Sequence, residues 1–287
     1  MTQVFILVGQ SNMEGQAVVD LDGQDYNNGK GTLTTLLKSD AGRRQMGHLV
    51  DSQGRWRKRS DVRVWYRPGN APATIGPLDF GYTGYLDRHH FGPELQFGHV
   101  VGDALRDPVL LIKCAWGGKS LYTDFRPPSS GGTTGAYYTR MLEHINEART
   151  SISGKSKLAG FVWYQGWNDG VDPKFAIPEY EANCVNLISD VRKALGDQDL
   201  PVAVGELTGG WRDAPPEWTR LRDAQKAATQ HRELGRRILF VPTRDFVRKP
   251  EDSPNPTHGH HEYGNAETIF LVGNALGNGI LAAASRR

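Results

Sequence analysis

The sequence predicts an α/β protein: a three-layer α/β/α sandwich around a central, mostly parallel sheet of about five to six strands. Six short apolar runs are continuous rather than alternating, which is typical of strands that are covered on both faces. Segments with helical spacing separate most of these runs, and such alternation favours parallel strands joined by right-handed crossovers. The predicted strands are Val4–Val8, Val62–Tyr66, Val109–Ile112, Leu158–Tyr164, Pro201–Val204 and Ile238–Val241.

Five segments carry apolar residues at the three- and four-residue spacing of an amphipathic helix. Gly196 follows one of them at the position where a glycine commonly ends a helix. No linker, repeat or shift in composition divides the chain, so we expect one domain over residues 1–287. A long polar and aromatic excursion at about residues 18–90 is expected to be functional or to cover another element. The predicted helices are Glu94–Leu105, Tyr137–Ala148, Pro178–Leu195, Trp218–His231 and Ala266–Ala283.

The composition argues against several classes of protein. A chain of 287 residues can bury a core without disulfides, and Cys114 and Cys184 are expected to be buried free thiols. Lys and Arg total 34 and Asp and Glu total 32, so the net charge of +2 predicts no nucleic-acid partner. No apolar stretch approaches the roughly 18 residues that span a bilayer, which predicts no membrane partner.

The first residues lack the basic region and the cleavage site of a secretory signal peptide. The chain therefore fits a cytoplasmic protein, or a secreted or periplasmic one whose leader has been removed. The sequence leaves the oligomeric state open.

Two glycine-containing loops follow predicted strands at the edge where open α/β sheets bind ligands. After the first strand comes Gly9–Met13, in which Ser11 has the position of a nucleophile at a strand-to-helix turn. The alternative for Ser11 is a helix N-cap. After the third strand come Gly117 and Gly118, whose backbone N–H groups could form one half of an oxyanion hole, or which could simply form a turn.

Two further loops at this edge carry polar side chains. Asn168 follows the fourth strand, and its amide could be the second oxyanion donor or a turn residue. His258, His260 and His261 come just before the last helix, where a histidine could take the serine proton as general base. A metal site and a polar surface loop are the alternatives, although no HExxH or paired-cysteine spacing supports zinc.

The order of these blocks resembles that of the SGNH hydrolase superfamily, and within it the carbohydrate acetylesterase branch related to sialate O-acetylesterases and carbohydrate esterase family six. GQSNM is the nucleophile block of that branch, and GWND fits the GxND block of the superfamily. WYQG, FGPE and a Gly-Gly pair followed by a serine are also typical of the branch. In this chain the five blocks are Gly9–Met13, Gly166–Asp169, Trp163–Gly166, Phe91–Glu94 and Gly117–Ser120, so the resemblance spans the first strand to the last helix.

The resemblance implies a serine esterase that removes O-acetyl groups from a carbohydrate, either sialic acid or a plant or bacterial polysaccharide, without a metal or other cofactor. Ser11 would attack the acetyl carbonyl, and family spacing to the last helix favours His261 as the base. The Ser11 and Gly118 N–H groups and the Asn168 amide would bind the oxyanion. Expected substrate-binding residues are Gln10, Trp116, Gln165 and Trp167, and other nearby aromatic and basic candidates are Tyr122, Trp211, Lys119 and Arg248.

One feature departs from the superfamily pattern, which usually places an aspartate three residues before the histidine. The residues three before the three histidines are Asn255, Thr257 and His258, and none is acidic. We therefore expect the acid elsewhere, with Asp245 after the last strand as first choice and Asp252 as second. A Ser–His dyad oriented by a backbone carbonyl is the third possibility.

Three other functions stay open at this point. A GDSL-type lipid or thioester hydrolase would use the same catalytic groups but needs a long apolar trough, for which the excursion is too polar. A carbohydrate-binding protein that kept the fold without catalysis would explain the missing aspartate. A metal hydrolase built on the three histidines is the last alternative.

Overall fold

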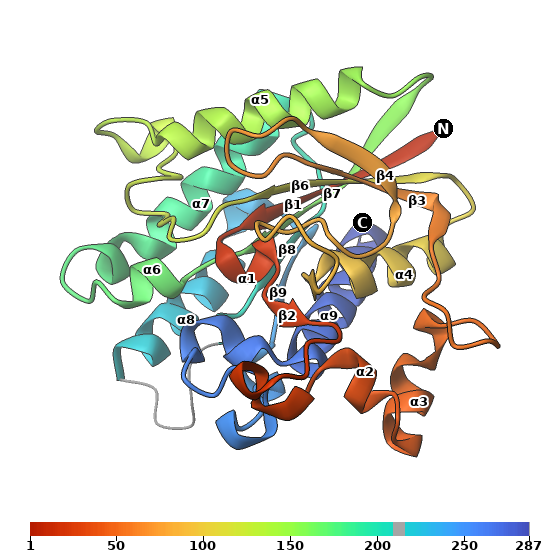
Figure 1. The fold of residues 1–287 in the computed structure, drawn as a ribbon. Helices are drawn as coiled ribbons and strands as arrows, with labels where there is room; N and C mark the ends of the chain where they lie inside the picture. The colour runs from red at the N-terminus through yellow and green to blue at the C-terminus, as the bar shows by residue number, and fades with distance from the viewer. Residues whose placement is uncertain (209–215, 287) are drawn as a thin grey trace.

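Parallel strands form the centre of the computed structural model, which describes residues 1–208 and 216–286 (Figure 1). All neighbouring strands of the main sheet are parallel except β3 and β4, which confirms the predicted mostly parallel sheet. Within the described residues this sheet has seven strands, in the order β4 (Thr74–Leu78), β3 (Arg59–Tyr66), β6 (Val109–Ala115), β1 (Thr2–Gly9), β7 (Ser156–Tyr164), β8 (Val202–Gly205) and β9 (Ile238–Val241).

The six predicted runs all form strands, and β4 is the addition that the sequence did not predict. Gly76 and Pro77 interrupt its apolar pattern, and proline is tolerated in β4 because this strand lies at the edge of the sheet. A separate ladder pairs β2 (Ala17–Val18) with β5 (His90–Phe91). This pairing closes the base of the excursion at about residues 18–90, so the excursion begins and ends next to the strand–helix turn after β1.

Helices cover both faces of the sheet, which confirms the three-layer sandwich. The side chains of β1 alternate between two hydrophobic clusters, with Val4 in one and Phe5 in the other. Helices α5, α7 and α8 pack on the first face, and α4 and α9 on the second (Figure 1). These five helices are α4 (Glu94–Ala104), α5 (Ala136–Thr150), α7 (Ala176–Leu195), α8 (Pro216–Ala228) and α9 (Ala266–Ser285), and the shorter ones are α1 (Ser11–Glu14), α2 (Leu33–Leu36), α3 (Asp40–Met46) and α6 (Trp167–Gly170).

The fold shows the environment of helix α9, of the two cysteines and of Gly196. Helix α9 is long and apolar enough to cross a membrane by length and composition, which we did not expect from the sequence. It packs against α4 and the sheet, however, and half of it is buried. Cys114 and Cys184 are buried free thiols, as expected. Gly196 adopts the left-handed conformation just after α7, as expected for a helix-ending glycine.

The register of the central strands brings the candidate loops together. Gly9 at the end of β1 pairs with Ala115 at the end of β6 and with Tyr164 at the end of β7. The three loops that follow therefore start at the same edge of the sheet. A Cβ atom at Gly9 would lie 2.1 Å from the Tyr164 carbonyl oxygen, so this close approach requires glycine.

Candidate active site

Ser11 begins α1, two residues after the end of β1. Its side chain is largely buried but lines a pocket of about 320 Å³ together with Gly117, Gly118 and His261. Its N–H group lies in the first turn of α1, where no intrahelical acceptor exists, and no group in the described residues accepts a hydrogen bond from it. Both the hydroxyl and this N–H are therefore available to a molecule in the pocket.

The Gly117–Gly118 turn and Asn168 meet at the same place. The Gly118 N–H has no acceptor among the described residues, and the Asn168 amide nitrogen donates a hydrogen bond to the Gly118 carbonyl oxygen at 2.7 Å. A side-chain amide carries two N–H donors, so this contact leaves one for another acceptor. The structure thus brings together the three groups that the sequence nominated for an oxyanion hole.

Gln10 clamps the loop that carries Asn168. Its buried Oε1 accepts hydrogen bonds from the Gly166 N–H at 3.3 Å, the Asn168 N–H at 3.2 Å and the Gln165 side chain at 3.2 Å. The Gln165 amide nitrogen also donates to Asp169. Gln10 and Gln165 were expected to bind substrate, but both amides are engaged inside the protein and support the position of Asn168.

Asp169 ties this loop to the one that follows Gly118. The buried carboxylate accepts hydrogen bonds from the backbone N–H groups of Leu121 and Tyr122, both at 2.9 Å, and from Gln165 at 2.6 Å. Burial raises the pKa of Asp169 to about 6, and the three donors oppose that rise. Asp169, the acidic residue of the GWND block, therefore links its own loop to the loop that follows Gly118.

His261 is the one of the three clustered histidines that lines the pocket with Ser11. It lies in a short 3-10 segment, η7 (Gly259–Gly264), just before α9. Burial, together with the neighbouring His260 and His258 rings, lowers the pKa of His261 to about 4. Its ring is therefore neutral at neutral pH, which a general base must be. His258 is exposed, and the half-buried His260 ring stands 5.9 Å from that of Trp167.

The segment after His261 has an unusual backbone and is linked to the nucleophile loop. Glu262 and Tyr263 both have positive φ values, 52° and 56°, which is uncommon for residues other than glycine. Asn12 donates a hydrogen bond to the Glu262 carboxylate at 3.2 Å. The residue after Ser11 therefore contacts the residue after His261, which couples the two loops.

The structure does not bring a carboxylate to His261. Asp245 lies in η5 (Arg244–Phe246) directly after β9, and Asp252 lies in η6 (Pro250–Asp252). Both are exposed, and no carboxylate in residues 1–208 or 216–286 accepts a hydrogen bond from the His261 ring. Within those same ranges, no three His, Cys, Asp or Glu side chains are grouped as metal ligands would be.

The aromatic and basic residues that were candidates for substrate binding differ in their exposure and in their contacts. Trp116 is only 4 % exposed and packs among aromatic rings of the core, so it offers no face to a substrate. Trp167 is half-buried, with its ring edge-to-face against Trp218. Trp211 lies outside the described residues. The other three candidates are engaged with neighbouring side chains: Lys119 with Asp124, Arg248 with Glu267, and Tyr122 with Arg126.

Four residues that line the pocket were not predicted from the sequence as site residues: Glu14, Gln16, Gly84 and Tyr85. Glu14 stands three residues after Ser11, and on a helix that spacing places two side chains on one face, which is a signal that could have found it. Gly84 and Tyr85 belong to no recognised motif. They reach Ser11 because the β2–β5 ladder folds the excursion back onto it.

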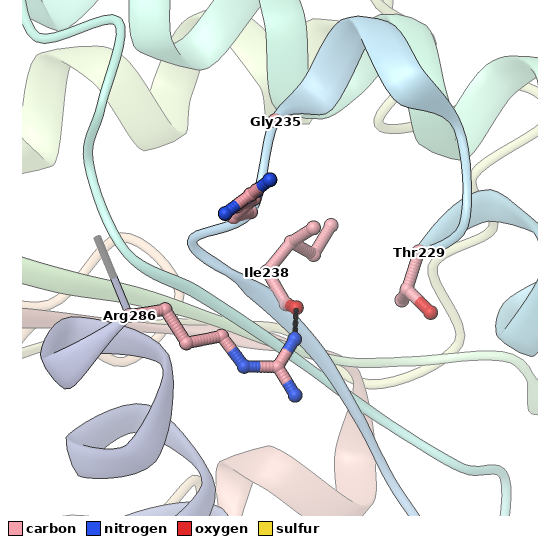
Figure 2. Close-up of a pocket in the computed structure, with 5 residues that line it drawn as sticks. Thr229, Gly235, Ile238 and Arg286 are labelled. Carbon is pink, nitrogen blue, oxygen red and sulfur yellow. Dashed lines mark hydrogen bonds between the residues drawn. The ribbon is translucent and has the colours of Figure 1, made fainter.

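A larger hollow lies at the opposite edge of the sheet, and its lining lacks a pair like Ser11 and His261. It has a volume of about 510 Å³ and lies where β9 begins, lined by Thr229, Gly235, Arg236, Ile238 and Arg286 (Figure 2). Arg286 there donates a hydrogen bond to the Ile238 carbonyl oxygen. These side chains include no nucleophile–base pair, so we assign the candidate active site to the pocket of Ser11.

Comparisons with known proteins identify the family and the fold of the chain. A family model described as "Carbohydrate esterase, sialic acid-specific acetylesterase" matches residues 1–266. No curated protein sequence matches the chain significantly.

Several solved structures share the fold. A protein from Arabidopsis thaliana superposes with a TM-score of 0.60 at 18% identity over 98% of both chains. NanS superposes with a TM-score of 0.57 at 15% identity, over 98% of this chain and 97% of NanS. A carbohydrate acetylesterase from Xanthomonas citri gives 0.55 at 15% identity, over 96% of this chain and 56% of that one. At these identities the likeness establishes the fold.

Proposed function

The chain belongs to the carbohydrate esterase family of sialic acid-specific acetylesterases, and we propose that it hydrolyses O-acetyl esters of a carbohydrate with Ser11 as nucleophile and His261 as base. Members of this family are carboxylic ester hydrolases. The observation that carries the proposal is that Ser11, His261 and the Gly117–Gly118 turn line one pocket at the edge where the parallel strands end.

The reaction follows from these positions. Neutral His261 takes the Ser11 hydroxyl proton while Oγ bonds to the acetyl carbon, and the carbonyl oxygen becomes an oxyanion. The N–H groups of Ser11, Gly118 and the Asn168 amide donate to that oxygen. The ester C–O bond then breaks, and His261 gives its proton to the leaving sugar oxygen. Water, deprotonated by His261, attacks the acetyl carbon; the bond from that carbon to Ser11 Oγ then breaks, His261 returns the proton to Oγ, and acetate leaves.

We propose that Ser11 and His261 act as a dyad. The support for this is that Asp245, the first candidate for the acid, is exposed and makes no hydrogen bond to the His261 ring. A base with a pKa near 4 needs no carboxylate to keep it neutral at neutral pH, although it accepts a proton less readily than an ordinary imidazole. We therefore expect Asp245→Asn to retain most of the activity.

The decisive experiment compares variants on 4-nitrophenyl acetate, acetylated xylan and an O-acetylated sialic acid. Ser11→Ala should abolish hydrolysis and leave the circular dichroism spectrum unchanged, because the hydroxyl contributes only to the chemistry. His261→Ala should remove nearly all of kcat, whereas His258→Ala and His260→Ala serve as matched controls with far smaller losses. Activity of more than a few per cent in pure Ser11→Ala, or an essential His258 or His260, would refute the assignment.

A further inference from the structure

Tyr85 forms an aromatic wall beside Ser11, although no step of the proposed reaction uses it. The residue is 47% exposed, which makes it one of the few large apolar residues that the described part of the chain leaves open to solvent. One face stacks on the His90 ring with centroids 3.7 Å apart and an interplanar angle of 10°. The Tyr85 hydroxyl donates a hydrogen bond to Gln16 Oε1 at 2.7 Å.

The support beneath this ring is rigid. His90 is buried, and its Nδ1 lies 3.0 Å from the Asp87 carboxylate. Tyr85 is therefore held at one face and at its hydroxyl before any ligand arrives. A ring fixed in advance loses little conformational entropy when a ligand stacks on it, which favours binding.

Glu14 lies on the same wall and has unused hydrogen-bonding capacity. Its Oε1 accepts a hydrogen bond from the Tyr66 hydroxyl at 3.0 Å, and its Oε2 accepts one from the Gly117 N–H at 3.1 Å. A carboxylate can accept about four hydrogen bonds, so about two positions remain for a ligand. The same contacts hold the Gly117–Gly118 turn in place.

The ionisable side chain on this wall is acidic. Burial raises the pKa of Glu14, and hydrogen bonds from the Tyr66 hydroxyl and the Gly117 N–H, together with the Lys113 ammonium group, oppose that rise. Lys113 itself is completely buried and bonds to Glu94 at 2.7 Å, so it is closed to a ligand. Among the described residues that line the pocket, there is no lysine or arginine.

We propose that Glu14, Gln16 and Tyr85 form a subsite for a neutral sugar, and that Glu14 makes the enzyme prefer neutral acetylated sugars to acidic ones. This inference rests on the proposed esterase function. The apolar face of a pyranose ring matches the exposed Tyr85 ring, and the hydroxyl groups at its rim match the acceptors of Glu14. An acidic sugar would bring its carboxylate next to the Glu14 carboxyl group, and no lysine or arginine in the described pocket lining would contact it.

The test uses two mono-O-acetylated methyl glycosides, a glucoside and the matching glucuronoside, which differ only in the carboxylate at C6. The wild-type kcat/KM should be higher for the glucoside by about tenfold or more, because two like charges repel across a partly desolvated pocket. Glu14→Gln should lower this ratio toward one. Any effect of that variant on the Gly117 turn slows both substrates and cancels in the ratio.

A second variant tests the aromatic wall. Tyr85→Ala should lower kcat/KM for the glucoside about tenfold more than for 4-nitrophenyl acetate, which has no sugar to stack; that factor corresponds to about 1.4 kcal/mol. Phe175→Ala is the matched control, because Phe175 is 52% exposed but does not line this pocket, and it should change neither ester.

Three results would overturn the subsite: a wild-type ratio at or below one, a ratio that Glu14→Gln leaves unchanged, or equal losses on both esters in Tyr85→Ala. Failure of the esterase proposal looks different, because the wild type would then not hydrolyse 4-nitrophenyl acetate, or Ser11→Ala would retain that activity.

Discussion

Replacing Gln10 with alanine tests how the second oxyanion donor is held in position. Gln10 is buried and accepts hydrogen bonds from the Asn168 N–H, the Gly166 N–H and the Gln165 side chain. Its own amide nitrogen lies 3.4 Å from Asn168 Oδ1. Asn168 is therefore held by Gln10 at both its backbone and its side chain, and Gln10→Ala removes both contacts.

The expected losses follow from these bonds. The Gln165 amide keeps its other partners, Asp169 and the Lys119 carbonyl. The Gly166 and Asn168 N–H groups are the donors left unpaired, and Asn168 Oδ1 also loses its donor. A buried donor without a partner costs about 1–3 kcal/mol, so the two donors together should lower the free energy of unfolding by about 2–6 kcal/mol. Loss of one oxyanion donor costs about a hundred- to a thousandfold in kcat, which is the upper limit for the effect on rate.

The assay measures kcat and KM on 4-nitrophenyl acetate, and urea unfolding in parallel. We expect kcat to fall while KM changes little, because the oxyanion contact forms in the transition state. Gln96→Ala is the matched control: it truncates a buried glutamine of α4 that bonds to His48 on the other face of the sheet. This control should lose stability and keep kcat.

A double-mutant cycle identifies the route of the effect. If Gln10 acts through Asn168, then Gln10→Ala should lower kcat little further in a protein that already carries Asn168→Ala. The reasoning is refuted if the losses in kcat multiply, or if Gln10→Ala alone keeps kcat within about threefold of the wild type.

Three further predictions concern proton binding, a buried ion pair and metals. Because the pKa of His261 is lowered to about 4, kcat/KM should hold from pH 7 to about pH 5, and an acid limb near pH 6.5 in the pH–rate profile would contradict this. At His261 the unfolded chain then binds more protons than the folded one between about pH 6.5 and 4, so the stability that this residue contributes should fall as the pH decreases through that range, which urea titrations of the wild type and His261→Ala can measure. Lys113→Met leaves the Glu94 carboxylate buried without its partner and should lower the free energy of unfolding by roughly 3–5 kcal/mol. Adding Glu94→Gln should recover most of this lost stability, and additive losses would show that the two side chains are not coupled. EDTA should not change the esterase activity, and a reversible loss restored by zinc would favour a metal hydrolase.

The secondary structure and the nucleophile block could be predicted because their signals are local. Continuous apolar runs indicated the six strands, and apolar residues at helical spacing indicated α4, α5, α7, α8 and α9. Gly9–Met13 and Gly166–Asp169 are contiguous motifs, so each was recognisable without knowledge of the fold. β4 was missed because Gly76 and Pro77 break the pattern that identifies a strand.

Side-chain environment is the part that local sequence patterns do not specify. Gln10, Gln165 and Trp116 were expected to meet the substrate, because each lies beside a candidate loop in the sequence. Their side chains instead point into contacts with other loops or the core. Position along the chain places a residue near the sheet edge, but it does not say which partner its side chain will find.

The sequence by itself determined the α/β class, the order of the strands and helices along the chain, and the family to which the chain belongs. The sequence also favoured His261 through its resemblance to a family, but only the tertiary structure decided that His261 lines one pocket with Ser11, that no described carboxylate bonds to it, and that Tyr85 shares this pocket. The physical reason is that these contacts join residues that are far apart in the sequence. They depend on strand register and on how the excursion folds back through β2 and β5, and no short-range periodicity in a sequence records either.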